Sequence, residues 1–242
     1  MSGPAAGSRR LVTVAHGTRK AAGNRVAVGI TRLAAERLGC EAVTSYVELC
    51  DPLLTEVLAT SATPTVVLPL LLSTGFHLRQ DLPAAVAGAG GPVVLGRSLG
   101  PHALLADAQV DQLRRAGATP GDPLVMVAAG SSDALATRDL DRAGDLLARA
   151  WGGPVRVATL SGLGHRPEEV VRAGDRVSPY LLASGFFADR AARVAREAGA
   201  TLVADVIGPH PLVVDLVVRR TRALFSIDPA DLHESADTAP LG

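Results

Sequence analysis

Short apolar segments alternate with longer amphipathic segments along the whole chain. The apolar segments are rich in valine and leucine and are too short to be helices, so each predicts a buried β-strand. The predicted strands are Leu11–Ala15, Ala42–Val47, Thr65–Leu71 and Val93–Leu95 in the first half, and Leu124–Val127, Val155–Leu160, Arg176–Leu182 and Thr201–Val206 in the second half.

The amphipathic segments between these strands carry apolar residues at helical spacing. The predicted helices are Ala21–Leu38, Pro52–Thr60, Arg79–Val86 and His102–Arg115 in the first half, and Leu135–Trp151, Pro167–Ala173, Phe187–Ala198 and Pro211–Phe225 in the second half. Gly39 and Gly117 suit the left-handed conformation that ends many helices. Because strands and helices alternate strictly, we predict an α/β fold with parallel sheets that are covered by helices on both faces.

Three segments of the first half return in the second half in the same order. Leu11–Thr18 is echoed by Leu124–Ser131, Pro69–His77 by Pro179–Phe187, and Leu99–His102 by Ile207–His210. Three ordered matches predict a duplicated unit. We therefore expect two tandem flavodoxin-like domains of about four strands each, over residues 1–119 and 120–227, with a boundary in a turn-rich stretch and a poorly ordered polar tail over 228–242.

Only the first copy keeps its histidines at two of the repeated positions. His16 and His77 are replaced by Ala129 and Phe187 in the second copy. Residues that both copies keep are typical of the fold, whereas residues that one copy has lost point to chemistry. Glu48 follows the second predicted strand, and parallel strands about 4.8 Å apart bring the groups at their carboxyl ends together. Two imidazoles and a carboxylate suit Fe²⁺, Co²⁺ or Ni²⁺ and leave coordination positions open.

Each of these residues also has a purely structural interpretation. His16 could belong to a helix-capping turn with Gly17 or Thr18, and His77 could be a packing residue, as Phe187 suggests. The loss of both histidines from the same copy favours a functional role. Glu48 is the weaker candidate, because isolated carboxylates at strand ends are more often solvated. His102 and His210 are present in both copies before a helix, so we interpret them as turn residues.

Composition and short motifs argue against several classes of protein. The 242 residues carry a formal net charge of zero, which gives no electrostatic basis for binding nucleic acid or an acidic membrane. Cys40 and Cys50 lack the spacing of a zinc or iron–sulfur motif, and no nucleotide-binding glycine motif is present. No apolar run is long enough for a membrane span, and residues 1–10 lack the apolar core of a signal peptide. We expect a cytoplasmic protein without nucleic acid or membrane partners.

Several motifs together resemble the class II tetrapyrrole chelatases, and within them the sirohydrochlorin ferrochelatase and cobaltochelatase group. These motifs are Ala15–Arg19, Val47–Leu49, Leu68–His77 and Asp81–Pro83. The resemblance covers nearly the whole chain, because this family also occurs in a duplicated two-domain form. It implies ATP-independent insertion of a divalent metal into sirohydrochlorin, in sirohaem or cobalamin biosynthesis, with Fe²⁺ as the first choice of metal. The metal would be a substrate, and no permanent cofactor is implied.

The resemblance also assigns roles to individual residues. The two metal-binding histidines of the family correspond to His16 and His77, and its acidic residue corresponds to Glu48, so these three would bind the metal and assist deprotonation of the ring. Sirohydrochlorin is rich in carboxylates, which makes the neighbouring cationic and glycine-rich positions candidates for substrate binding. These candidates are Arg19, Lys20, Gly75, Phe76 and Arg79.

Two alternatives stay open at this stage. The first is a cobalt or nickel chelatase for a related tetrapyrrole, and the second is a non-catalytic carrier of a tetrapyrrole or a metal. We expect the second half to cover the cleft, in place of the partner subunit that a one-domain relative would recruit. That arrangement predicts a monomer, with a homodimer as the alternative.

Overall fold

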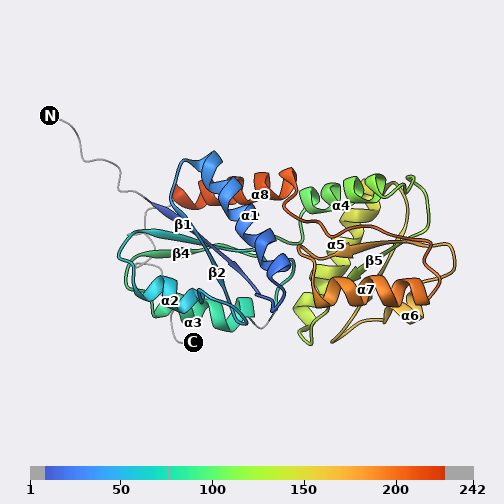
Figure 1. Ribbon diagram of the computed structural model, residues 1–242, viewed down its shortest axis with the longest axis horizontal. Helices are drawn as coiled ribbons and strands as arrows, with labels where there is room; N and C mark the ends of the chain where they lie inside the picture. Colours follow the sequence, from blue (N-terminus) through green and yellow to red (C-terminus); the bar gives the residue numbers. More distant parts are fainter. Residues whose placement is uncertain (1–8, 76, 227–242) are drawn as a thin grey trace, which may run out of the picture.

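The computed structural model describes residues 9–75 and 77–226, apart from the side chains of His77 and Leu78. Two parallel sheets lie side by side (Figure 1). The first sheet has the order β2-β1-β3-β4, with β1 Arg10–Ala15, β2 Ala42–Tyr46, β3 Thr65–Pro69 and β4 Val93–Leu95. The second sheet has the equivalent order β6-β5-β7-β8, with β5 Leu124–Ala128, β6 Val155–Thr159, β7 Arg176–Tyr180 and β8 Leu202–Val203. The predicted pair of parallel four-stranded sheets is confirmed.

Several strands end before their apolar runs do. β7 stops at Tyr180 although the apolar run continues to Leu182, and β3 stops at Pro69 although the run continues to Leu71. The additional residues lie beyond the ends of the strands and line a pocket. An apolar run indicates that its residues are buried, but it does not show whether they are buried in a strand or in the wall of a pocket. The predicted strands were therefore longer than the observed ones.

Helices connect the strands as predicted. The long ones are α1 Ala21–Leu38, α4 Ala103–Arg115, α5 Ala134–Trp151, α7 Phe186–Glu197 and α8 Pro211–Phe225. The short ones are α2 Leu54–Ala59, α3 Leu82–Ala87 and α6 Pro167–Val170, together with the π-helical turn η1 His77–Asp81. The predicted helix over 79–86 is therefore the end of η1 followed by α3. None of the described helices is long and apolar enough to cross a membrane.

The last helix of each half packs on the other half. α8 lies against α1 and β3 of the first half, whereas α4 lies against α5 and β7 of the second half (Figure 1). A buried hydrogen bond of 2.8 Å from Gln109 Nε2 to Ser178 Oγ joins α4 to β7. Arg37 of α1 forms an ion pair with Asp215 of α8. Because of this exchange, the largest hydrophobic cluster contains residues from both halves.

Candidate functional site

A pocket of about 780 Å³ lies between the two halves. Its walls are the loops that follow β1, β3, β5 and β7, at the carboxyl ends of both sheets, where ligands of parallel α/β sheets bind. Its size is that of a small-molecule site. The first turn of α1 lies close to the loop that follows β7, since a Cβ atom at Gly23 would lie 2.6 Å from the carbonyl oxygen of Ser184.

His16 and Glu48 come together at this pocket. His16 lines it, and its Nε2 atom is 3.6 Å from Oε1 of Glu48, with both side chains about half exposed. The backbone fixes the pair, because the amide of Glu48 donates a 3.2 Å hydrogen bond to the carbonyl of His16. Gly17 has φ +97°, and a Cβ atom there would lie 1.9 Å from the carbonyl oxygen of Glu48. Only glycine permits this close approach, so the His-Gly motif has a structural reason.

The third predicted ligand follows another wall of the same pocket. Residues Leu70–Gly75 line the pocket, and η1 begins at His77, two positions after Gly75. The side chain of His77 and the whole of Phe76 lie outside the described residues. Within the described residues, no three His, Cys, Asp or Glu side chains form a group that could hold a metal ion. The complete ligand set His16, Glu48 and His77 therefore stays a prediction.

Strand register identifies the counterpart of Glu48, which the sequence left open. Ala15 pairs with Tyr46 in the first sheet, and Ala128 pairs with Thr159 in the second. Two residues further along, Glu48 corresponds to Ser161, whose hydroxyl donates a 2.7 Å hydrogen bond to the carbonyl of Ala129. All three predicted ligands are thus replaced in the second half, by Ala129, Ser161 and Phe187.

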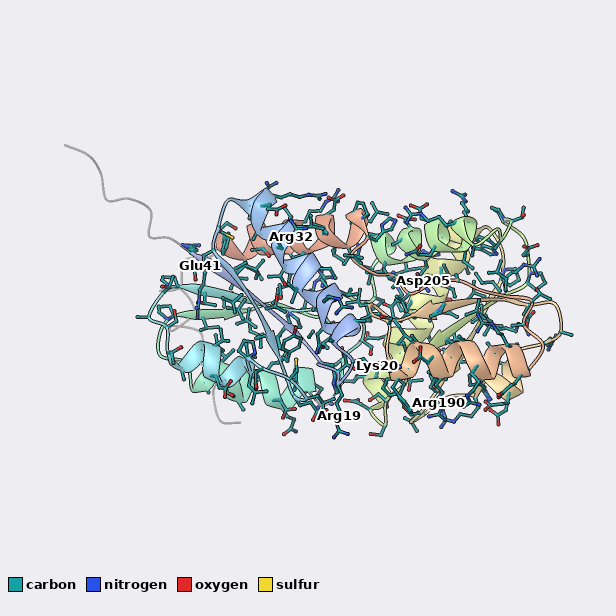
Figure 2. All side chains as sticks on the ribbon, in the orientation of Figure 1. Arg19, Lys20, Arg32, Glu41, Arg190 and Asp205 are labelled. Carbon is teal, nitrogen blue, oxygen red and sulfur yellow. The ribbon has the colours of Figure 1, made fainter. Side chains whose placement is uncertain are left out.

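The predicted substrate-binding cations lie where the two halves meet. Arg19 and Lys20 line the pocket together with Gly75, and Figure 2 shows Lys20 beside the start of α7. Lys20 forms an ion pair with Asp189 of α7. Arg79 is not among the lining residues, and its Nη1 atom is 3.2 Å from Oδ2 of Asp133, the N-cap of α5.

These two ion pairs are equivalent under the duplication. In the repeat alignment Lys20 corresponds to Asp133, and Arg79 corresponds to Asp189. Each pair therefore joins the same two positions of opposite halves. The first half contributes both cations and the second half contributes both carboxylates.

Two residues that the sequence analysis missed hold the loop that precedes His77. The Tyr180 hydroxyl donates a 3.1 Å hydrogen bond to the carbonyl of Leu72, and a carboxylate oxygen of Asp139 accepts a 2.6 Å hydrogen bond from the amide of Thr74. Tyr180 is buried, and this desolvation raises the pKa of its phenol above the ordinary value. The only sequence signal is a tyrosine in an apolar strand, whose hydroxyl needs a partner when buried.

Comparisons with known proteins agree with this architecture. SirB from Bacillus subtilis with Fe³⁺ superimposes with a TM-score of 0.77 at 22% identity, over 90% of this chain and 96% of that chain. The sirohydrochlorin chelatase SirB from Bacillus subtilis subspecies spizizenii, in complex with cobalt, has a TM-score of 0.74 at 22% identity, over 89% of this chain and 94% of that chain.

A more distant structure is CbiX, the terminal enzyme for biosynthesis of siroheme in denitrifying bacteria. It has a TM-score of 0.65 at 17% identity, over 91% of this chain and 100% of that chain. A sequence comparison with curated proteins returned no significant match. The CbiX family model matches residues 10–116 and again residues 123–224, so both repeats are recognised. The chain therefore belongs to the CbiX family.

Proposed function

We propose that this protein is a chelatase that inserts a divalent metal, Fe²⁺ or Co²⁺, into sirohydrochlorin without ATP. The observation that carries the proposal is the His16–Glu48 pair, with Nε2 3.6 Å from Oε1, in which His16 lines a pocket of about 780 Å³. Its support from relatives is the CbiX family match over both repeats and the fold shared with SirB structures that contain Fe³⁺ or cobalt.

The exposure of this pair suits metal transfer. A metal that must pass from water to the ring nitrogens needs ligands that leave coordination positions open. His16 and Glu48 are each about half exposed, so an incoming ion can reach both side chains from solvent. Imidazole is a good ligand for borderline metals and, near neutral pH, also a good proton acceptor. We assign His16, Glu48 and His77 to metal binding and to removal of the two pyrrole protons.

The second half serves this site as a wall and a support. It contributes Tyr180, Ser184, Phe186 and Phe187 to the pocket lining but none of the predicted metal ligands. The first half thus carries the predicted metal site, and the second half of the same chain covers it. We therefore propose a monomer as the active form, with Arg19 and Lys20 placed to meet the carboxylates of the substrate. Light scattering of the active protein tests this, and activity that disappears on dilution below a dimer's dissociation constant would contradict it.

The function is tested by anaerobic insertion of Fe²⁺ and Co²⁺ into sirohydrochlorin, followed by absorbance. We expect many turnovers per wild-type chain and a loss of at least about 100-fold in kcat for His16→Ala, because general acid–base groups contribute about that much. We expect Glu48→Gln to lower kcat less severely, since an amide oxygen remains available to the metal.

The chain offers a matched control for these variants. His165 and Glu169 of the second half form a surface pair of the same kind, with Nδ1 3.7 Å from Oε2, outside the pocket lining. His165→Ala should leave turnover at the wild-type level. Stoichiometric binding of metal or tetrapyrrole without turnover would instead identify a carrier, and turnover that is indifferent to His16 would place the chemistry elsewhere.

A further inference from the structure

Exposed apolar side chains gather at the pocket. Within the described part of the chain, six large hydrophobic side chains are exposed, and three of them line the pocket. These are Leu49, Phe186 and Phe187, with exposed fractions of 48%, 64% and 39%. A single exposed apolar residue is unremarkable, but a group of them around a pocket marks a binding surface.

The backbone of Leu49 shows that its side chain serves something other than the turn. Leu49 has φ +68°, and no other described non-glycine residue has positive φ. Its counterpart in the second half is Gly162, with φ +66°. A bulky side chain is unfavourable in this conformation, and such strain is typically kept at functional sites. Because glycine makes the same turn in the second half, the turn itself does not require leucine.

The two phenylalanines bring apolar side chains from the second half to the pocket lining. They begin α7 immediately after Gly185, and their rings pack edge to face, with centroids 5.5 Å apart and planes inclined by 74°. This contact holds the rings in a defined arrangement while leaving them exposed. Phe187 occupies the repeat position that corresponds to His77, so the second half presents an aromatic ring where the first has a predicted metal ligand.

We propose that Leu49 from the first half, with Phe186 and Phe187 from the second half, forms an apolar surface of the pocket against which the tetrapyrrole ring packs. The inference rests on the proposed function and deepens it, since it gives the second repeat a direct part in substrate binding. A tetrapyrrole is a broad, flat, largely apolar disc with charged groups at its edge. Apolar side chains within the pocket and the cations Arg19 and Lys20 in its lining match both parts of such a molecule.

The Leu49→Gly variant separates a role of the Leu49 side chain in substrate binding from a role in the stability of the turn. Glycine suits φ +68°, so the relieved strain offsets the flexibility that glycine adds, and the thermal unfolding midpoint should stay close to that of the wild type. Binding of metal-free sirohydrochlorin is measured by absorbance titration without metal. We expect the Kd of Leu49→Gly and of Phe186→Ala to rise about tenfold each, which is about 1.4 kcal/mol.

Two further variants serve as controls for the Kd measurement. Leu163→Gly removes a leucine that is equally exposed, at 46%, and follows Gly162 but does not line the pocket, so its Kd should equal the wild-type value. Leu49→Asn keeps a side chain that tolerates the left-handed conformation while removing its apolar character, and it should bind as weakly as Leu49→Gly.

The outcomes distinguish this inference from the proposed function. Wild-type turnover with an unchanged Kd in Leu49→Gly and Phe186→Ala would overturn the inference and leave the chelatase assignment standing. An unchanged Kd with a lowered kcat would also overturn it, because Leu49 would then act by positioning Glu48. A Phe186→Ala variant that binds normally but changes its mass in solution would assign the surface to a second copy of the chain. A wild type that neither binds nor metallates sirohydrochlorin would overturn both.

Discussion

The two repeats have the same sheet order and the same close turn after their first strand, yet they present different side chains at that turn. A Cβ atom at Gly17 or at Gly130 would lie about 2 Å from the carbonyl oxygen of Glu48 or Ser161 respectively. The backbone of the turn is therefore equivalent in both halves. His16 and Glu48 occupy it in the first half, and Ala129 and Ser161 occupy it in the second.

This difference shows that the fold tolerates the loss of the polar pair. What the second half has kept instead are contacts to the first half: Tyr180 and Asp139 to the loop before His77, and Asp133 and Asp189 to the two cations. We interpret the second repeat as a support that positions the loops of the first repeat, in addition to the apolar side chains that it contributes to the pocket.

The largest effect is expected from exchanging the imidazole between the repeats. His16→Ala should lower kcat by about 100-fold or more, and adding Ala129→His to it should not restore turnover, because Ser161 and Phe187 supply no further ligand. The measurement is single-chain turnover in the anaerobic insertion assay. Recovered activity in the double variant would show that the repeats are still interchangeable.

The next effect concerns the support of the His77 loop. Asp139→Ala removes the acceptor of the 2.6 Å hydrogen bond from Thr74, which should cost about 1.5–3 kcal/mol of unfolding free energy because the acceptor is charged. We also expect kcat to fall about tenfold with little change in KM, since a small misplacement of a catalytic loop affects the rate. Urea unfolding and steady-state kinetics test both parts.

Two variants make this prediction specific. Asp139→Asn keeps an oxygen acceptor and should recover most of the rate. Asp141→Ala removes an exposed carboxylate of the same helix and should leave the rate unchanged. Equal losses in Asp139→Ala and Asp141→Ala would mean that helix charge, and not the hydrogen bond to Thr74, is responsible.

A smaller effect is expected from the two ion pairs between the halves, Lys20–Asp189 and Arg79–Asp133. Asp189→Asn and Asp133→Asn each release a cation from its carboxylate, so Lys20 or Arg79 can interact with the carboxylates of the substrate, and KM should fall about threefold. Stability should change by less than about 1 kcal/mol, because these pairs are partly exposed, and asparagine can still cap α5 at position 133. A KM that rises in both variants would show that the ion pairs build the site.

The smallest effect is expected from the histidine that caps the last helix of each repeat. Nδ1 of His102 accepts a 3.1 Å hydrogen bond from Leu104 N, and Nδ1 of His210 accepts a 3.3 Å hydrogen bond from Leu212 N, so both residues cap helices. Burial is the main cause that lowers the pKa of each imidazole below its ordinary value. Arg220 and Arg97 lower it further in His102, whereas Asp111 opposes the shift in His210.

The sign of the pH dependence follows from these shifts. Because the pKa of each histidine is lower in the folded chain, the unfolded chain binds more protons below about pH 6.5. The contribution of these two histidines to the free energy of unfolding is therefore complete above that pH and is lost as the pH falls. The double variant His102→Asn/His210→Asn caps both helices without titrating. Its urea midpoint should therefore fall less than that of the wild type between pH 7 and pH 5, and identical pH profiles would contradict the prediction.

Much of the fold was predictable because it depends on short-range patterns. Apolar runs of strand length alternate with amphipathic segments, and the three repeated motifs indicate two equivalent sheets whatever the packing between them. The positions of His16 and Glu48 were predictable for a similar reason, since both follow consecutive predicted strands, and consecutive strands are usually neighbours in a sheet. The pattern also marked what had been lost from the second copy at Ala129 and Phe187.

Only the tertiary structure decided how the halves combine. The exchange of α4 and α8 between the halves cannot be read from the sequence, because an amphipathic helix has the same apolar stripe whichever sheet it covers. The contacts of Tyr180, Asp139, Lys20 and Arg79 join residues more than fifty positions apart, and their partners depend on the placement of two rigid sheets. Local sequence thus determined the fold of each repeat and the positions of His16 and Glu48 at the ends of its strands, whereas long-range packing determined the pocket between the repeats.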